Sequence, residues 1–143
     1  MENAKEQIMT AEEINAFLEE HFPQIGSTGF TVEAAQGRSI TMRMPFRERM
    51  LRPGGTISGP AMFALADVAM YAAVLAMIGP RPLAVTTNLN INFLRRPKPG
   101  EMLADATILK IGKRLAVGEV SLRSDGEEEL VAHATSTYSL PEA

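Results

Sequence analysis

Apolar and polar residues alternate along six stretches of the chain, and a period of two residues is the pattern of a half-buried β-strand. The clearest stretch is residues 84–94, where Leu89, Ile91 and Phe93 alternate with three asparagines. The same pattern predicts strands at residues 30–35, 39–46, 102–111, 115–123 and 130–140. Antiparallel hairpins are expected at three turn-forming pairs, Gln36-Gly37, Gly112-Lys113 and Asp125-Gly126.

Two stretches break this alternation and predict helices. The first begins at a capping box, residues 10–13, and continues as a short amphipathic helix to about His21, before Pro23 ends it. The second is residues 61–78, in which every side chain except Asp67 is apolar or aromatic. Such a helix is expected to be buried on all sides.

The second helix is also close to the lower length limit of a membrane span, which is about 18 apolar residues. In a span, however, Asp67 would lie near mid-membrane at a considerable cost in free energy. The predicted strands also need an apolar element on which to pack. The segment is therefore expected to be the core helix of a soluble fold, with no membrane partner.

The element order is helix, two strands, long helix and four strands. It predicts an α+β protein in which one long helix packs on a mostly antiparallel sheet. A helix that is apolar all round needs more cover than one flat sheet face provides, so a strongly curved sheet or a second subunit is expected. Residues 47–56, between the second strand and the long helix, are expected to form a polar loop.

The length, net charge and composition of the chain narrow the range of possible functions. At 143 residues, one domain over residues 1–143 is the simplest organisation, and a net charge of −3 argues against general binding to nucleic acid. The chain has no cysteine, and its two histidines, His21 and His133, have no metal-ligand spacing, so no metal site is expected. The acidic N-terminus lacks an apolar run, so a cytoplasmic protein is expected.

Two stretches carry a resemblance to a known family: GGTISGPAMFALADVAMYAAV, around the start of the long helix, and NLNINFLRRPKPGEMLADATILKIGKRLAVGEVSL, in the later strands. With the chain length and the element order, they resemble the PaaI-like hotdog-fold acyl-CoA thioesterases of the 4-hydroxybenzoyl-CoA thioesterase superfamily. The resemblance covers residues 28–140 and leaves residues 1–27 as an N-terminal helical extension.

The resemblance implies a hotdog fold, in which a curved antiparallel sheet wraps around the central helix. It implies a homodimer or a dimer of dimers, with sheets paired edge to edge and active sites that contain residues of both chains. The implied reaction is hydrolysis of an acyl- or aryl-CoA thioester to the free acid and coenzyme A, without a metal or redox cofactor.

The lone acid of the long helix is the first catalytic candidate. Thioester hydrolysis needs an activated water or a carboxylate nucleophile, and the chain offers no cysteine and no nucleophile-elbow serine. Burial of a lone carboxylate is costly without a partner, and the flanking residues offer none. Asp67 is therefore predicted to act as general base or nucleophile, in the family's position for the helix carboxylate. The alternatives are a residue of the helix surface and a buried acid satisfied by neighbouring hydrogen bonds.

The helix start is the second candidate. Family members carry His-Gly-Gly where this chain has Ser58-Gly59-Pro60, and the resemblance points to the Gly59 amide as the oxyanion donor. Plain N-capping is the other interpretation of Ser58 and Gly59. Arg52 stands where relatives often carry an asparagine that holds the thioester carbonyl or the attacking water. It either polarises the same oxygen or is a surface arginine.

A threonine is the third candidate, because Thr86-Thr87 corresponds to the family's small hydroxyl residue that orients the water or the carboxylate. Alignment through Leu89 favours Thr86, whereas strand parity puts Thr87 on the apolar face with Leu89. A β-bulge would reconcile the two arguments. A β-branched residue that simply favours a strand is the alternative.

Seven basic residues lie between residues 81 and 114, against two acidic ones. The following are predicted to contact the phosphates of coenzyme A: Arg95, Arg96, Lys98, Lys113 and Arg114. For any single residue, a solvated strand end that discourages edge pairing is the alternative.

Two other functions remain open. A hydratase or dehydratase on the same fold pairs a histidine with a carboxylate, and no histidine is close to Asp67 in the sequence. A non-catalytic acyl-CoA binding protein or sensor is consistent with the absence of the motif histidine and asparagine.

Overall fold

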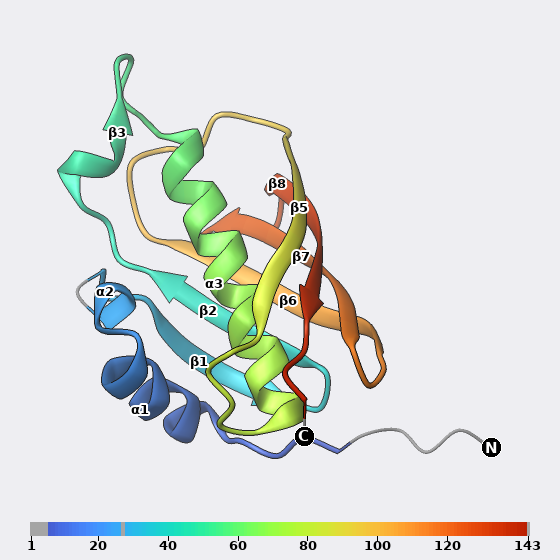
Figure 1. Cartoon of the computed structure of the whole chain (residues 1–143). Coiled ribbons are helices and arrows are strands. Elements are labelled where there is room, and N and C mark those ends of the chain that lie inside the picture. Colours follow the sequence, from blue (N-terminus) through green and yellow to red (C-terminus); the bar gives the residue numbers. More distant parts are fainter. Residues whose placement is uncertain (1–5, 27, 143) are drawn as a thin grey trace.

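The computed structural model describes residues 6–26 and 28–142, with a 20-residue helix, α3 (Gly59–Ile78), at its centre. One antiparallel sheet curves around this helix (Figure 1). Its order is β1-β2-β6-β7-β8-β5. The strand bounds are β1 (Thr31–Gln36), β2 (Ser39–Met44), β5 (Val85–Phe93), β6 (Met102–Ile111), β7 (Leu115–Ser124) and β8 (Leu130–Ser139).

The N-terminal helix, α1 (Ala11–His21), begins at the predicted capping box. The N–H of Glu13 donates to Thr10 Oγ1 (3.2 Å), and the N–H of Thr10 donates to the Glu13 carboxylate (3.0 Å). A single turn, α2 (Pro23–Gly26), follows. The buried side of α1 joins the core beside β1 and α3.

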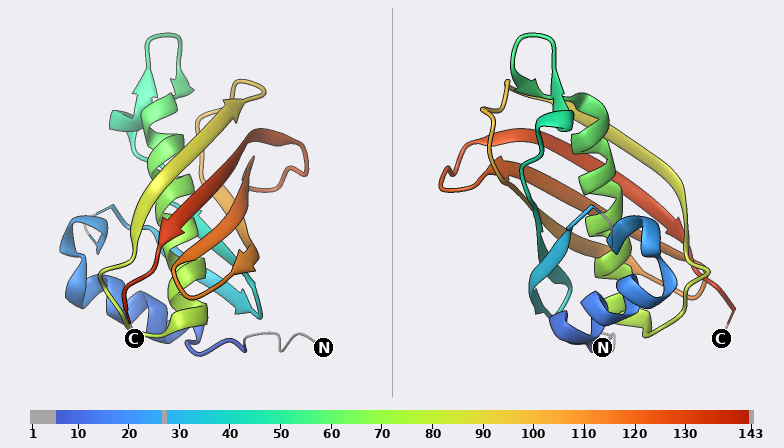
Figure 2. Two further views of the ribbon diagram at one scale, coloured as in Figure 1. Left: turned by 45° about the vertical axis from the view of Figure 1, so that its right-hand side comes forward. Right: turned by 90° about the vertical axis from the view of Figure 1, so that its left-hand side faces the viewer.

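The sheet curves tightly enough for β7 to pass close to α3 (Figure 2). A Cβ atom at Gly118 would lie 2.7 Å from Met70 Sδ and 2.7 Å from the carbonyl oxygen of Thr107. Such distances are far below van der Waals contact, so glycine is required at this crossing. The predicted α+β architecture, with a long helix on a curved antiparallel sheet, is confirmed.

Within the protomer, α3 is buried on all sides except one stripe, where a second subunit would have to provide the expected cover. Pro60, Phe63 and Ala64 are exposed and Asp67 is half-buried, and their spacing places them on one side of the helix. The remainder is covered by the sheet and α1. By length and composition α3 would pass for a membrane span, but 78% of its most apolar window is buried inside the fold.

Residues 47–56 are not the plain polar loop that their composition predicts. A 3-10 turn, η1 (Glu48–Met50), leads into a hairpin of two-residue strands, β3 (Leu51–Arg52) and β4 (Thr56–Ile57). Gly54 and Gly55 turn the chain with φ angles of 103° and 78°. The hairpin projects beyond the N-terminal end of α3 (Figure 1).

The two edges of the sheet differ. At β1, the side chain of Asn15 occupies the edge: its Nδ2 donates to the carbonyl oxygen of Val32 (2.9 Å), and its Oδ1 accepts from the N–H of Val32 (2.8 Å). At the other edge, no strand of the described chain lies beyond β5, and seven of the nine β5 residues are exposed. Hence β1 is blocked against further pairing and β5 is open.

Candidate active site

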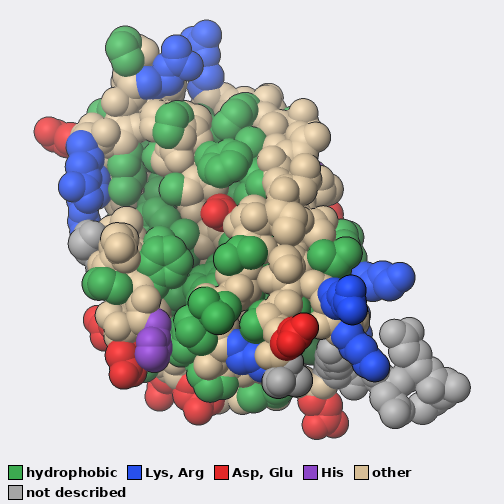
Figure 3. Space-filling view, in the orientation of Figure 1, with side chains coloured by type: hydrophobic (Ala, Val, Ile, Leu, Met, Phe, Trp, Pro, Cys, Tyr) green, Lys and Arg blue, Asp and Glu red, His purple; other side chains and the backbone are tan. Residues whose placement is uncertain are grey.

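The carboxylate of Asp67 projects from the exposed stripe of α3 into an apolar surrounding. In Figure 3, an acidic side chain lies amid hydrophobic ones over α3 and β5, and Asp67 is the single acid of these two elements. Its Oδ1 accepts hydrogen bonds from Thr86 Oγ1 (2.7 Å) and from the Tyr138 hydroxyl (2.8 Å). Within the described chain, no donor contacts Oδ2. One oxygen is therefore fixed and the other is free to react.

A β-bulge decides which of the two threonines faces Asp67. The pairing of β5 with β8 shifts between Thr86 and Asn88, so Thr87 is the extra residue. The bulge brings Thr86 onto the same face as Leu89, against α3, and turns the Thr87 hydroxyl to the carbonyl oxygen of Thr137 (3.1 Å). The alignment argument and the parity argument are reconciled in this way.

Tyr138 is the site residue that sequence analysis missed. It lies on β8 opposite Thr86, is 3% exposed, and also donates to the backbone oxygen of Asp67 (3.1 Å). Burial, followed by the negative charge of Asp67, raises the pKa of Tyr138 well above its usual range, so the hydroxyl stays a donor. The available signal was a tyrosine on the core-facing side of β8, because a buried hydroxyl needs a partner.

The helix start is built as an N-cap. Ser58 Oγ accepts from the N–H of Ala61 (3.3 Å), so its side chain is engaged in capping. Gly59 is the first helical residue, and a Cβ there would lie 3.4 Å from the ring of Phe93. Eight residues of helix separate Gly59 from Asp67, which is about 12 Å along the axis. The Gly59 amide and the Asp67 carboxylate of one protomer are thus too far apart to hold the same carbonyl group.

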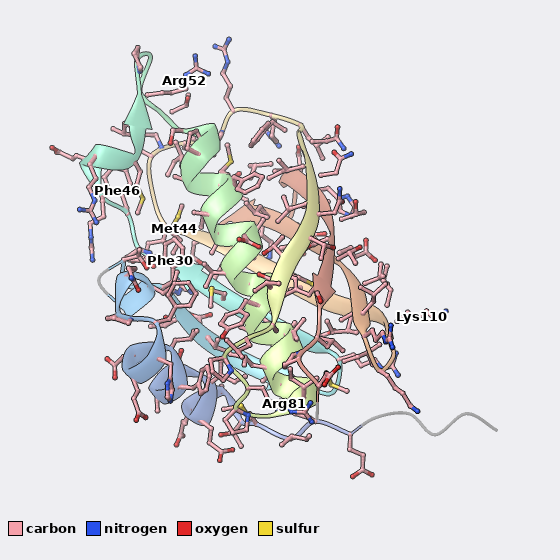
Figure 4. The ribbon with its side chains drawn as sticks, in the orientation of Figure 1. Phe30, Met44, Phe46, Arg52, Arg81 and Lys110 are labelled. Atoms are coloured by element: carbon pink, nitrogen blue, oxygen red, sulfur yellow. The ribbon has the colours of Figure 1, made fainter. Side chains whose placement is uncertain are left out.

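Arg52 lies on the β3–β4 hairpin beyond the N-terminal end of α3 (Figure 4). No hydrogen bond or ion pair joins it to Asp67 in the described structure. With Arg96, it instead lines a hollow of about 460 Å³ that has Phe93 and Met62 in its wall. The geometry therefore places Arg52 beside a cavity mouth and away from the carboxylate of its own protomer.

The predicted phosphate-binding residues do not form one cluster within the protomer. Arg95, which pairs with Glu129, lines the hollow beside Gly59 and Pro60 at the N-terminal end of α3. Lys98, whose Nζ is 3.7 Å from Glu127, follows in the loop after β5. At the opposite end, Lys113 and Arg114 line a hollow of about 840 Å³ with Arg81, which Figure 4 shows beside the C-terminal turn of α3. A 20-residue helix is about 30 Å long, which gives the scale of the separation.

The two histidines lie away from Asp67. The ring of His21 lies tilted against that of Phe17 in α1, and His133 Nε2 lies 2.8 Å from Glu119 on the sheet. Among the described residues, no group of three or more His, Cys, Asp or Glu side chains is arranged to hold a metal ion. The site consists of a carboxylate and neutral hydroxyl groups.

Comparison with known proteins decides the family. The model of the thioesterase superfamily matches residues 54–131, which include Gly59, Asp67 and Thr86. The chain belongs to the thioesterase superfamily.

Individual relatives agree with this membership. A "putative thioesterase" from Silicibacter sp. TM1040 has a crystal structure with a TM-score of 0.88 and 50% identity, covering 97% of this chain and 96% of the other. A "putative esterase" of Saccharolobus solfataricus is 32% identical over 92% of this chain and 85% of its own. The fold is shared with the PaaI protein of the E. coli phenylacetic acid degradation operon, with a TM-score of 0.80, 20% identity, and coverage of 92% and 93% of the two chains.

Membership confirms three predictions: the resemblance to PaaI-like thioesterases, the hotdog fold and the enzyme class, a thioester hydrolase. This thioesterase departs from the predicted site in two ways. Asp67 has partners, Thr86 and Tyr138, that lie far from it in the sequence, and Arg52 is held away from it.

Proposed function

We propose that this protein hydrolyses acyl- or aryl-CoA thioesters to the free acid and coenzyme A, with Asp67 as general base or nucleophile. The proposal rests on the contacts and position of the Asp67 carboxylate. Two hydroxyl donors hold Oδ1, while Oδ2 is free, on the exposed stripe of an apolar helix. A fixed carboxylate with one unengaged oxygen suits attack on a thioester or activation of a water.

Both chemical routes use the same oxygen. As general base, Oδ2 takes a proton from water while the water oxygen bonds to the thioester carbonyl carbon. The C–S bond then breaks, coenzyme A leaves as the thiolate, and the proton held by Asp67 passes to that thiolate or to solvent. As nucleophile, Oδ2 bonds to that carbon and expels the thiolate, and water opens the resulting anhydride. Neither route needs a metal or a redox cofactor. Label in the Asp67 carboxyl group after a single turnover in H₂¹⁸O would identify the nucleophilic route.

The oxyanion donor is proposed to come from a second protomer, because the Gly59 amide lies about 12 Å from Asp67 along its own helix. The open β5 edge is where the partner is expected, since Asn15 blocks the β1 edge. Antiparallel pairing of two β5 strands extends the sheet across a two-fold axis. Pairing would also cover the exposed Phe63 and Phe93.

The contacts at each end of β5 indicate the register of this pair. Asp67 bonds to Thr86, whereas Gly59 packs on Phe93. If the two-fold axis passes at Asn90, and Thr87 remains the bulged residue, the partner's Phe93 lies opposite Thr86. The partner's Gly59 amide then arrives beside Asp67, and two equivalent sites form per dimer.

The same pairing accounts for the divided basic residues. Within one protomer, Lys113 and Arg114 lie at one end and Arg95 and Arg96 at the other. Antiparallel pairing brings the first end of one protomer beside the second end of its partner. Together they would surround the mouth of the site with positive charge for the pyrophosphate and 3′-phosphate of coenzyme A. Arg52, at the cavity mouth, is proposed to contribute to this binding rather than to polarise the carbonyl.

The test is turnover of short-, medium-, long-chain and aryl acyl-CoAs, with released thiol followed by a thiol reagent. The chain has no cysteine, so only free coenzyme A reacts. Thiol release on at least one substrate is expected. No turnover on any of them, with stoichiometric acyl-CoA binding by calorimetry, would establish the binding-protein alternative instead.

A further inference from the structure

Tyr138 makes three contacts that together fix the carboxylate of Asp67. Its hydroxyl donates to Asp67 Oδ1 (2.8 Å) and to the backbone oxygen of Asp67 (3.1 Å). Its ring stacks on that of Tyr71, with centroids 6.1 Å apart and planes at 25°. A buried ring that is held by a second ring has little freedom, so the position of its hydroxyl is well defined.

We propose that Tyr138 is a positioning residue, which holds Oδ1 of Asp67 from the buried side and thereby presents Oδ2 as the reacting oxygen. This inference rests on the proposed function of Asp67. It adds Tyr138, which is not among the site residues predicted from the sequence.

The two hydroxyl donors of Oδ1 differ in their surroundings. Thr86 lies on the edge strand β5 and is exposed in the protomer, whereas Tyr138 lies one strand inward, on β8, and is buried. The fixed side of the carboxylate is therefore set from the interior of the fold. Because Tyr138 also contacts the backbone oxygen of Asp67, it ties the side chain to the helix from which it projects.

Few titratable groups surround this carboxylate. Tyr138 on β8 and Tyr71, one turn further along α3, are the tyrosines at the site, and β5 carries no titratable side chain. His133, the other titratable group of β8, is engaged with Glu119. Tyr71 is therefore the natural comparison for the loss of the Tyr138 hydroxyl.

The test compares Tyr138→Phe with Tyr71→Phe, which is a matched control. Both substitutions remove one hydroxyl from a buried, stacked ring, but the Tyr71 hydroxyl donates to the carbonyl oxygen of Pro82 (3.1 Å) and not to Asp67. Tyr138→Phe is expected to lower kcat about tenfold or more, with KM changed less than about twofold. Tyr71→Phe should leave kcat within about twofold of the wild type.

Two further measurements separate positioning from general damage to the fold. Thermal unfolding checks that both variants are folded at the assay temperature. In an Asp67→Asn background, Tyr138→Phe is expected to cause no further loss of the residual turnover, because its effect passes through the carboxylate. A wild-type kcat in Tyr138→Phe, or an equal fall of kcat in Tyr71→Phe, would overturn the proposal.

Crystal structures of the two variants give a readout that does not depend on turnover. In Tyr138→Phe, the carboxylate of Asp67 should leave the position seen here, while in Tyr71→Phe it should keep it. An inactive wild type would refute the proposed hydrolysis, and the structures would still decide whether Tyr138 positions Asp67. An unmoved carboxylate in Tyr138→Phe would contradict the positioning role on its own.

Discussion

The hydroxyl of Thr86 reaches the catalytic candidate from the edge of the sheet, 19 residues along the chain from it. Because the bulge turns the neighbouring hydroxyl of Thr87 to the backbone of β8, adjacent threonines of one strand have different surroundings. Thr86→Val is expected to lower kcat about tenfold, since Asp67 loses one of two donors that orient it. Thr86→Ser keeps a donor and should retain most of the activity. Thr87→Val is the matched control, and a loss equal to that of Thr86→Val would show that this assignment is wrong.

The buried hydroxyl of Tyr138 also predicts a pH dependence of stability. Its pKa is raised in the folded protein, by burial first, relative to about 10 in the unfolded chain. Above pH 10 the unfolded state loses this proton while the folded state keeps it, so the free energy of unfolding falls as the pH rises further. Urea titrations at pH 9 and at pH 11 should show a smaller fall in Tyr138→Phe than in the wild type. An identical fall in both would contradict the proposed burial of the hydroxyl.

Asp67 could be predicted from the sequence, whereas its hydrogen-bond partner Tyr138 could not. A lone acid in a run of 18 otherwise apolar or aromatic residues is conspicuous in the sequence, so it could be singled out without a structure. Tyr138 could not, because its link to Asp67 spans 71 residues and depends on where β8 passes α3. Arg52 was assigned by position in the family motif, but the hairpin that carries it projects away from the carboxylate.

The elements themselves were largely predictable, because periodicity is a local property. The strand at Met102–Ile111 has the predicted bounds, and the other strands of the sheet differ from prediction by one or two residues at an end. The β3–β4 hairpin was missed, since strands of two residues are too short to show a period. The open stripe of α3 was missed as well, because composition records which residues are apolar and not which side of a helix the sheet leaves uncovered.

Pairing of two protomers through the open edge of β5 can be tested by cross-linking. If two protomers pair through β5 about an axis at Asn90, a cysteine at residue 90 lies directly opposite its copy and within disulfide range. Because the chain is naturally free of cysteine, Asn90→Cys should give a covalent dimer on mild oxidation, seen on non-reducing gels.

Thr135→Cys is the control for this cross-link. Thr135, on β8, is the cross-strand partner of Asn90, so the two side chains lie on the same face of the sheet and at the same position along the strands. Thr135 lies one strand further from the axis. Its two copies would be about 14 Å apart, which is three strand spacings and too far to bridge. Equal cross-linking of both variants, or of neither, would count against pairing through β5.

At the scale of the whole molecule, the proposed site is complete only in an oligomer. A protomer of 15.5 kDa is therefore expected to sediment as a dimer or a dimer of dimers at assay concentrations. Specific activity should fall on dilution into the range where dimers dissociate, because each site loses the partner's Gly59 amide. Asn90→Lys, which places like charges on both sides of the axis, should shift this fall to higher concentration. A monomer with full, concentration-independent activity would refute the shared site.

The central claim is that the free oxygen of Asp67 carries the hydrolysis, and one pair of variants tests it most directly. Asp67→Asn keeps the shape of the side chain and removes its basicity. Asp105→Asn makes the same change in a carboxylate on β6. The oxygens of that carboxylate accept hydrogen bonds from Thr41 (2.7 Å) and Arg123 (3.1 Å). With the best acyl-CoA of the panel, kcat should fall about 100-fold or more in Asp67→Asn and stay within about twofold of wild type in Asp105→Asn. Turnover by Asp67→Asn at the wild-type rate would contradict the account.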